Sequence, residues 1–174
     1  MKLLEIFTTL NILATPMNLD KMKDVGESAH KIMQVSNINH ESALNIAYYL
    51  EKYETENIDS DLILSLIKTE SSFNQKARNR YDGDSPSFGL GQIKYFWKKH
   101  YGVTGSLYDP ETNIRLMYMI LGDYKKKYGD LEVAISAYNR GEMKVNRDLK
   151  KGRNPTNKYS KKVLNLYDSF KDKK

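Results

Sequence analysis

Residues 63–74 read Ile-Leu-Ser-Leu-Ile-Lys-Thr-Glu-Ser-Ser-Phe-Asn. The apolar residues of this stretch recur at three- and four-residue spacing, which predicts a helix that begins after an N-cap at Asp59 and ends near Ser71. Glu70 lies four residues after Leu66, so the same spacing places a carboxyl on the apolar face. Burial should raise the pKa of that carboxyl, and a carboxyl still protonated at working pH can act as a general acid. The alternative is a glutamate of the last turn that extends into solvent.

The segments on either side of this helix are mostly helical as well. Residues 19–34 and 41–54 carry apolar stripes that are typical of two packing helices. Residues 72–92 are rich in glycine and asparagine, so we expect a long irregular segment there. Three further helices are expected: one with N-cap Asp109 and Pro110 in its first turn that ends at Gly129, one between Asp130 and Gly141, and one that begins near Thr156.

Length and composition predict one folded domain and exclude several classes of chemistry. The chain has 174 residues, of which 40% are hydrophobic and 29% are charged, as in ordinary globular proteins. It contains no cysteine, which excludes disulfides, thiolate nucleophiles and cysteine-bound zinc. Its three histidines lack the HExxH spacing, so a zinc hydrolase is not expected.

Positive charge is concentrated at the C-terminal end of the chain. The formal net charge is +6, and residues 140–174 hold 12 Lys or Arg against 4 Asp or Glu. Such a run can be a solvated helix face that aids solubility, or a surface that binds nucleic acid or another anionic polymer. The three interpretations remain open at this point.

The N-terminus gives no clear targeting signal. Residues 1–15 hold one lysine and an apolar stretch that Glu5 and Asn11 interrupt, which is a poor match to a signal peptide. No stretch approaches the roughly 20 apolar residues that cross a bilayer. We therefore expect a protein that is not transmembrane and that reaches its target by other means.

Ordered sequence blocks identify the family that this chain resembles. Residues 63–74, with Glu-Ser at 70–71 and Ala-Arg-Asn at 77–79, are similar to the catalytic helix of the soluble-type lytic transglycosylases and the turn after it. The later blocks are Gly89-Leu90-Gly91-Gln92-Ile93, Asp109-Pro110-Glu111-Thr112-Asn113-Ile114, Ala137-Tyr138-Asn139-Arg140-Gly141 and Tyr159-Ser160-Lys161-Lys162-Val163-Leu164. The resemblance covers about residues 44–168. Enzymes of this family are lysozyme-like and cleave the glycan strands of peptidoglycan.

The resemblance implies a fold class and a division of the chain. Residues 41–174 should form a mostly α, lysozyme-like catalytic domain with a basic C-terminal helix. Its long irregular loop, with room for a small β-hairpin, should lie at the active-site cleft. Residues 1–40 should form an N-terminal helical extension, to which the resemblance assigns no role.

The resemblance also implies the residues of the site. Glu70 would be the catalytic acid and base. Gln92 and the backbone around Gly89 and Gly91, which we call the glycine loop, would line the cleft beside it. The hydroxyl of Tyr138 would point at Glu70 or at the sugar that is cleaved. The expected substrate-binding residues are Ser71, Asn79, Gly89, Gly91, Gln92, Tyr138, Asn139 and Tyr159. No metal or cofactor is expected.

One carboxyl suffices for this reaction because the substrate supplies its own nucleophile. Glu70 would protonate the glycosidic oxygen between MurNAc and GlcNAc and then take the proton of the C6 hydroxyl, which leaves a 1,6-anhydromuramoyl end. The expected partners are peptidoglycan glycan strands and a phage particle or a secretion or conjugation machine, at the cell wall or periplasm. No nucleic acid is expected.

Two alternatives keep the fold and change the activity. Asp82 or Asp84, in the longer loop at residues 80–86, could supply the second carboxylate of a muramidase-type hydrolase. The domain could also be a structural or wall-binding component of a virion or envelope assembly, with little activity.

Two residues depart from the family pattern. Gly91 stands where the family has methionine, which would remove an apolar wall from the cleft. Arg140 stands where the family has a small residue, which would put a large cation near the site.

Overall fold

The computed structural model describes residues 18–172, and their fold is mostly helical, as predicted. The prediction that residues 1–15 are a poor match to a signal peptide concerns a segment outside this range. The helices are α2 (Leu19–Val35), α3 (His40–Tyr53), α4 (Ser60–Glu70), α5 (Tyr95–His100), α6 (Pro110–Tyr128), α7 (Leu131–Arg140), α8 (Glu142–Lys150) and α9 (Lys158–Lys171). No helix in the described range is long and apolar enough to cross a membrane.

Polar N-caps begin three of these helices where the sequence predicts them, at Asp59, Asp109 and Asp130. Asp59 accepts a hydrogen bond from the backbone of Leu62 and begins α4. Asp109 caps α6, and Gly129 ends that helix with a left-handed φ of 69°. The last helix begins at Lys158 rather than near Thr156, because Asn157 and not Thr156 forms its capping box.

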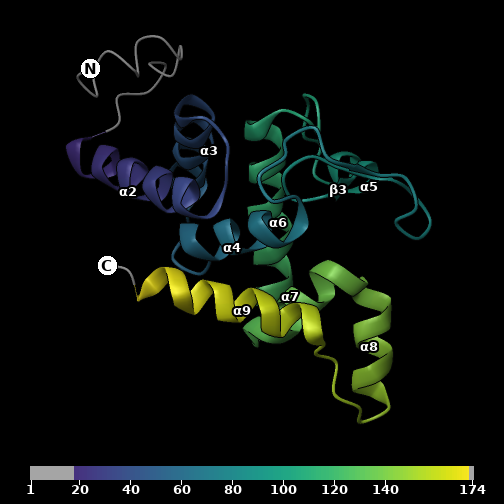
Figure 1. Ribbon diagram of the computed structural model, residues 1–174. Helices are drawn as coiled ribbons and strands as arrows, with labels where there is room; N and C mark the ends of the chain where they lie inside the picture. The colour runs from purple at the N-terminus through teal and green to yellow at the C-terminus, as the bar shows by residue number, and fades with distance from the viewer. Residues whose placement is uncertain (1–17, 173–174) are drawn as a thin grey trace.

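α4 lies at the centre of the molecule and buries the apolar face that contains Leu62, Leu66 and Ile67. It packs most extensively against α9, and α6 passes behind it between α3 and α7 (Figure 1). These helices share one hydrophobic core, in which Leu116 and Met117 of α6 are fully buried.

The segment before residue 41 contributes α2 to the same core. Val25, Ala29 and Ile32 of α2 are buried against α3. The ammonium of Lys31 lies 2.7 Å and 2.8 Å from the two carboxylate oxygens of Asp61, in the first turn of α4. Both groups are buried, so this ion pair fixes α2 against the helix that ends at Glu70.

The irregular segment contains a three-stranded antiparallel sheet, which confirms the predicted hairpin. The strands are β1 (Arg78–Asn79), β2 (Ser87–Phe88) and β3 (Ile93–Lys94), in the order β1-β2-β3. Phe88 lies opposite both Arg78 and Ile93. The sheet and α5 form one side of the molecule, and α8 lies at its lower edge (Figure 1).

Candidate active site

Glu70 is the last residue of α4, and the hydroxyl of Tyr159 donates a hydrogen bond to its Oε1 atom. Tyr159 is in the first turn of α9, so the packing of α9 on α4 brings together two residues that are 89 positions apart. Both side chains are partly buried. The sequence predicted Tyr159 in the cleft, and its contact with Glu70 follows from this packing.

Burial raises the pKa of Glu70 from its ordinary value of 4.5 to about 7. The hydrogen bond from Tyr159 opposes this rise because it favours the carboxylate. Two charges act with smaller effects: Asp82 raises the pKa and Lys162 lowers it. Glu70 is therefore divided between its acid and its carboxylate near neutral pH, which is the state that a group needs to donate a proton and later accept one.

The chain turns sharply after Glu70. Ser72 and Phe73 have φ values of 50° and 66°, in the left-handed region that side chains with a Cβ disfavour. The Phe73 side chain is only 2% exposed, and its burial in the core offsets the backbone strain. This turn changes the direction of the chain directly after α4.

Tyr138 lies near Glu70 but hydrogen-bonds elsewhere. Its hydroxyl donates to the backbone oxygen of Gly91 at 2.8 Å. Burial raises the pKa of Tyr138 well above its ordinary value, and the negative charge of Glu70 raises it further. The hydroxyl therefore stays protonated, and it joins α7 to the glycine loop beside the acid. The direct contact with Glu70 belongs to Tyr159.

Asn113 of α6 holds the glycine loop in place. Its side-chain nitrogen donates to the backbone oxygens of Phe88 at 3.0 Å and Leu107 at 2.7 Å, and its side-chain oxygen accepts from the backbone nitrogen of Gly91 at 2.7 Å. Asn113 is fully buried. Asn113 is not among the site residues that the sequence predicts, although a polar residue inside the apolar stripe of a helix is a recognisable signal.

Gly89 is required by this close packing. Its φ is 74°, and a Cβ there would lie 2.2 Å from the Leu107 oxygen and 2.4 Å from the Asn113 nitrogen. Gln92 also has a positive φ, of 51°. Its amide donates to the Gly89 oxygen at 2.9 Å and accepts from Ser87 at 3.0 Å, so it stabilises the loop from within.

The space beside Gly91 is filled by α6. A Cβ on Gly91 would lie 2.4 Å from the sulfur of Met117 and 2.8 Å from the hydroxyl of Tyr138. Met117 of the neighbouring helix therefore already supplies an apolar side chain where a side chain at residue 91 would lie.

Arg140 does not direct its charge at Glu70. Its guanidinium donates to the Pro155 oxygen at 2.6 Å and pairs with Asp148 of α8 at 2.5 Å. It therefore links the end of α7 to α8 and to the connection before α9. Its neighbour Asn139 accepts a hydrogen bond at 3.2 Å from Asn157, the N-cap of α9.

Ser71 and Asn79 make local backbone contacts. The Ser71 hydroxyl donates to the Ile67 oxygen at 3.3 Å, and the Asn79 side chain accepts from the Tyr81 backbone at 3.1 Å. Neither bonds to Glu70. Ser71 thus stabilises the end of α4, and Asn79 stabilises the turn that follows β1.

Asp82 is the carboxylate that acts on Glu70 from the β1–β2 loop. Lys94 holds it: the ammonium lies 3.7 Å from its carboxylate and donates to its backbone oxygen at 2.7 Å. Asp84 is exposed and forms no ion pair within residues 18–172. In the same range no three His, Asp or Glu side chains gather in a way that would hold a metal ion.

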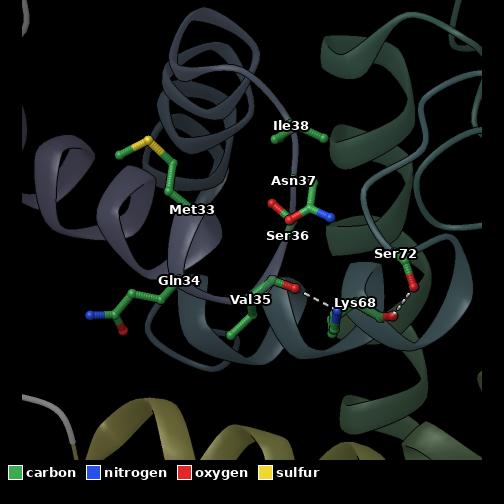
Figure 2. A pocket seen from close by; sticks show the side chains of 8 residues that line it. All are labelled: Met33, Gln34, Val35, Ser36, Asn37, Ile38, Lys68 and Ser72. Carbon is green, nitrogen blue, oxygen red and sulfur yellow. Dashed lines mark hydrogen bonds between the residues drawn. The ribbon is translucent and has the colours of Figure 1, made fainter.

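A hollow of about 600 Å³ lies away from this site (Figure 2). It lies between residues 33–38, which end α2 and lead to α3, and the side chains of Lys68 and Ser72. Lys68 lines it, and its ammonium donates to the Val35 oxygen at 2.5 Å. Glu70 and the other predicted site residues do not line it.

Comparison with known proteins assigns the class that this fold and site indicate. Residues 47–161 match the family described as Transglycosylase SLT domain. The invasion protein IagB of Salmonella typhi is 29% identical over 129 residues, which cover 71% of this chain and 77% of IagB. The transglycosylase of Enterobacteria phage PRD1 is 32% identical over 108 residues, which cover 62% of this chain and 37% of the phage protein.

A solved structure shares the fold. The 70 kDa soluble lytic transglycosylase Slt70 of Escherichia coli superposes with a TM-score of 0.54 at 18% identity, over 92% of this chain and 31% of Slt70. The described fold is thus lysozyme-like and similar to that of Slt70. The chain belongs to the transglycosylase SLT domain family and is a lytic transglycosylase.

Proposed function

We propose that this enzyme cleaves the β-1,4 bond between MurNAc and GlcNAc in peptidoglycan and leaves 1,6-anhydromuramoyl ends, with Glu70 as its acid and base. The observation that carries the proposal is the partly buried carboxyl of Glu70, with a pKa of about 7 and a hydrogen bond from Tyr159. A carboxyl with this pKa can hold a proton when substrate binds and can also release it.

The reaction needs one protein carboxyl in two steps. Glu70 first donates its proton to the glycosidic oxygen, and the bond from that oxygen to C1 of MurNAc breaks as the GlcNAc hydroxyl leaves. The C6 hydroxyl of the same MurNAc then forms a bond to C1, and its proton passes to the Glu70 carboxylate. The carboxyl is restored, no water is consumed, and the new ring is the anhydro end.

The residues around Glu70 have distinct proposed roles. Tyr159 positions the carboxyl, and the hydroxyl of Tyr138 holds the Gly91 carbonyl, which leaves that stretch of backbone beside the acid. Gly89, Gln92, Ser71, Asn79 and Asn139 act through the loops and caps that they stabilise. Substrate would thus lie against backbone that these contacts fix in advance.

A hydrolytic alternative rests on Asp82. Its charge reaches Glu70, as the second carboxylate of a muramidase would. Lys94 pairs with Asp82, however, and holds it through two contacts of the loop. We therefore assign Asp82 to the electrostatic environment of Glu70 and not to attack on the sugar.

Mass spectrometry of soluble fragments released from purified sacculi tests the proposal. Fragments that lack one water per cleaved bond are expected from the native enzyme and from Asp82→Asn, and none from Glu70→Gln. Asp84→Asn is the matched control for the loop, since Asp84 is exposed. Reducing-end fragments that disappear in Asp82→Asn would replace the proposal with hydrolysis, and full activity in Glu70→Gln would exclude Glu70 as the acid.

We further propose that the enzyme opens the wall locally for a phage particle or a secretion or conjugation machine, acting at the cell wall or periplasm. The support is that one relative is named an invasion protein and another is the transglycosylase of a phage. Purified particles or assemblies from the source cell can be separated by electrophoresis in a gel that contains peptidoglycan. A cleared band should then appear at the mass of this chain. Activity only in fractions free of such assemblies would contradict this role.

A further inference from the structure

Within the described residues, exposed cations without ion-pair partners recur on α8 and at the start of α9. Lys144, Arg147, Lys150 and Lys151 lie on and just after α8, and Lys158 and Lys161 lie in the first turn of α9. All six side chains are exposed, and none pairs with a carboxylate anywhere in residues 18–172. We call these six residues the basic surface.

The structure keeps this surface positive. Asp148 is the acidic residue between Lys144 and Lys161, and Arg140 from α7 already pairs with it. Lys144, Arg147 and Lys150 repeat every three residues, a rise of about 4.5 Å per step along a helix. Like charges at this spacing repel one another, so the arrangement disfavours the free state and favours a bound anion.

The shape of the surface is fixed by contacts to the catalytic body. The Arg140 guanidinium joins Asp148 of α8 to Pro155 in the connection before α9. α9 carries Tyr159, which bonds to Glu70. A ligand on the basic surface would therefore bind to helices that are joined directly to the residues around Glu70.

The side chains around the cations restrict the ligand. Between residues 141 and 172 no aromatic ring is exposed, because Tyr159 and Tyr167 are partly buried with bonded hydroxyls and Phe170 is buried. Single-stranded nucleic acid usually needs such rings to stack its bases. α8 directs Val145 into the core and exposes two apolar side chains, Met143 and Leu149. These two lie about 120° apart around the helix, so they form no continuous apolar face to insert into lipid. Charge is the main property that the surface offers.

We propose that the basic surface binds a linear phosphodiester polymer of the cell wall, of the poly(glycerol phosphate) type, and holds the enzyme against the wall beside its substrate. Cations that follow one another at each helical turn suit a chain with one phosphate in every short repeat. Peptide carboxylates are set farther apart, on separate disaccharides of the glycan strand. Guanidinium groups such as Arg147 also match the geometry of phosphate oxygens.

Binding of fluorescent poly(glycerol phosphate) to the full chain, measured by anisotropy at several salt concentrations, tests this inference. The variant Lys144→Gln, Arg147→Gln, Lys150→Gln, Lys151→Gln should bind at least about tenfold more weakly. Its slope of log affinity against log salt should fall by about 3, because each lost phosphate contact removes about 0.7. The matched control changes four exposed lysines elsewhere to Gln, at Lys23, Lys76, Lys99 and Lys126, and should bind within about twofold of native.

Three competing probes make the result decisive: poly-glutamate, single-stranded DNA and anionic phosphatidylglycerol vesicles. Weaker binding of all three than of poly(glycerol phosphate) supports the inference. Equal or tighter binding of any of them overturns it, as does an equal loss in both fourfold variants. The variant with four substitutions on and just after α8 should release fragments at the native rate from sacculi stripped of phosphate polymer. This result would show that the variant folds, and it separates this inference from the proposed catalytic function.

Discussion

Replacement of Glu70 by glutamine should stabilise the fold at alkaline pH while it abolishes activity. The native carboxyl has a pKa of about 7 in the folded protein against an ordinary value of 4.5, because burial disfavours its charged form. Glutamine has nearly the same shape, carries no charge and still offers an oxygen to the Tyr159 hydroxyl. The substitution therefore removes the cost of burying a carboxylate and leaves most contacts in place.

The magnitude follows from the two pKa values. The folded state binds the proton more tightly than the unfolded state, so native stability falls as pH rises from about 4.5 to about 7. At pH 8 the lost stability is about 3 kcal/mol, and at pH 5 it is below about 1 kcal/mol. Glu70→Gln should accordingly gain about 2 to 3 kcal/mol over the native protein between pH 5 and pH 8.

Urea denaturation of both proteins at pH 5 and pH 8 measures this difference. Glu27→Gln is the control, since Glu27 is exposed on α2, and its difference from native should be the same at both pH values within about 0.5 kcal/mol. A gain from Glu70→Gln that does not change with pH would refute the argument that burial raises the pKa. A gain that is larger at pH 5 would reverse its sign.

Three further predictions follow from the contacts of the site. Tyr159→Phe removes the hydrogen bond that favours the carboxylate of Glu70, so the pH at which activity falls on the alkaline side should move up. The carboxyl also loses the contact that positions it, so kcat/KM should drop about tenfold. A pH–rate profile measures both changes. Asp82→Asn removes a negative charge that raises the pKa of Glu70, so the same limb should move to lower pH with fragment release retained; an unmoved limb would show that the charge does not reach the acid. Asn113→Ala leaves three backbone groups without partners, and urea denaturation should show a loss of about 2 to 4 kcal/mol; a loss below 1 kcal/mol would mean that the glycine loop is held in another way.

Local sequence signals were sufficient to predict most of the helices. Both ends of α6 could be predicted because the residues there act locally. The Asp109 side chain caps the first turn next to Pro110, and Gly129 adopts the left-handed backbone that ends the helix. The helices α5 and α8 were not predicted. α5 is six residues long and buries none of them, and α8 follows α7 directly through Gly141, so neither shows a long apolar stripe.

The site was predictable where it depends on one helix and not where it depends on packing. The four-residue step from Leu66 to Glu70 predicts a carboxyl on an apolar face, and it leaves a glutamate that extends into solvent as the alternative. The burial of Glu70 and its bond from Tyr159 exclude that alternative. Spacing alone does not bring Tyr159 to Glu70, since α9 must first pack on α4. The contact between Gly91 and Met117 also depends on packing. The side chain of Met117, on α6, fills the space that a side chain at residue 91 would need.

The pKa of Glu70 is set by a balance that suits a single acid and base. Burial alone would push the pKa upward, and a carboxyl that never released its proton could not accept the one from the C6 hydroxyl. The Tyr159 hydrogen bond and the Lys162 charge oppose burial, and Asp82 adds to it, so that the pKa is about 7. A hydrolase can divide the two tasks between two carboxyls with different pKa values. Where one carboxyl performs both, a pKa near the working pH keeps each of its two states available when the reaction needs it.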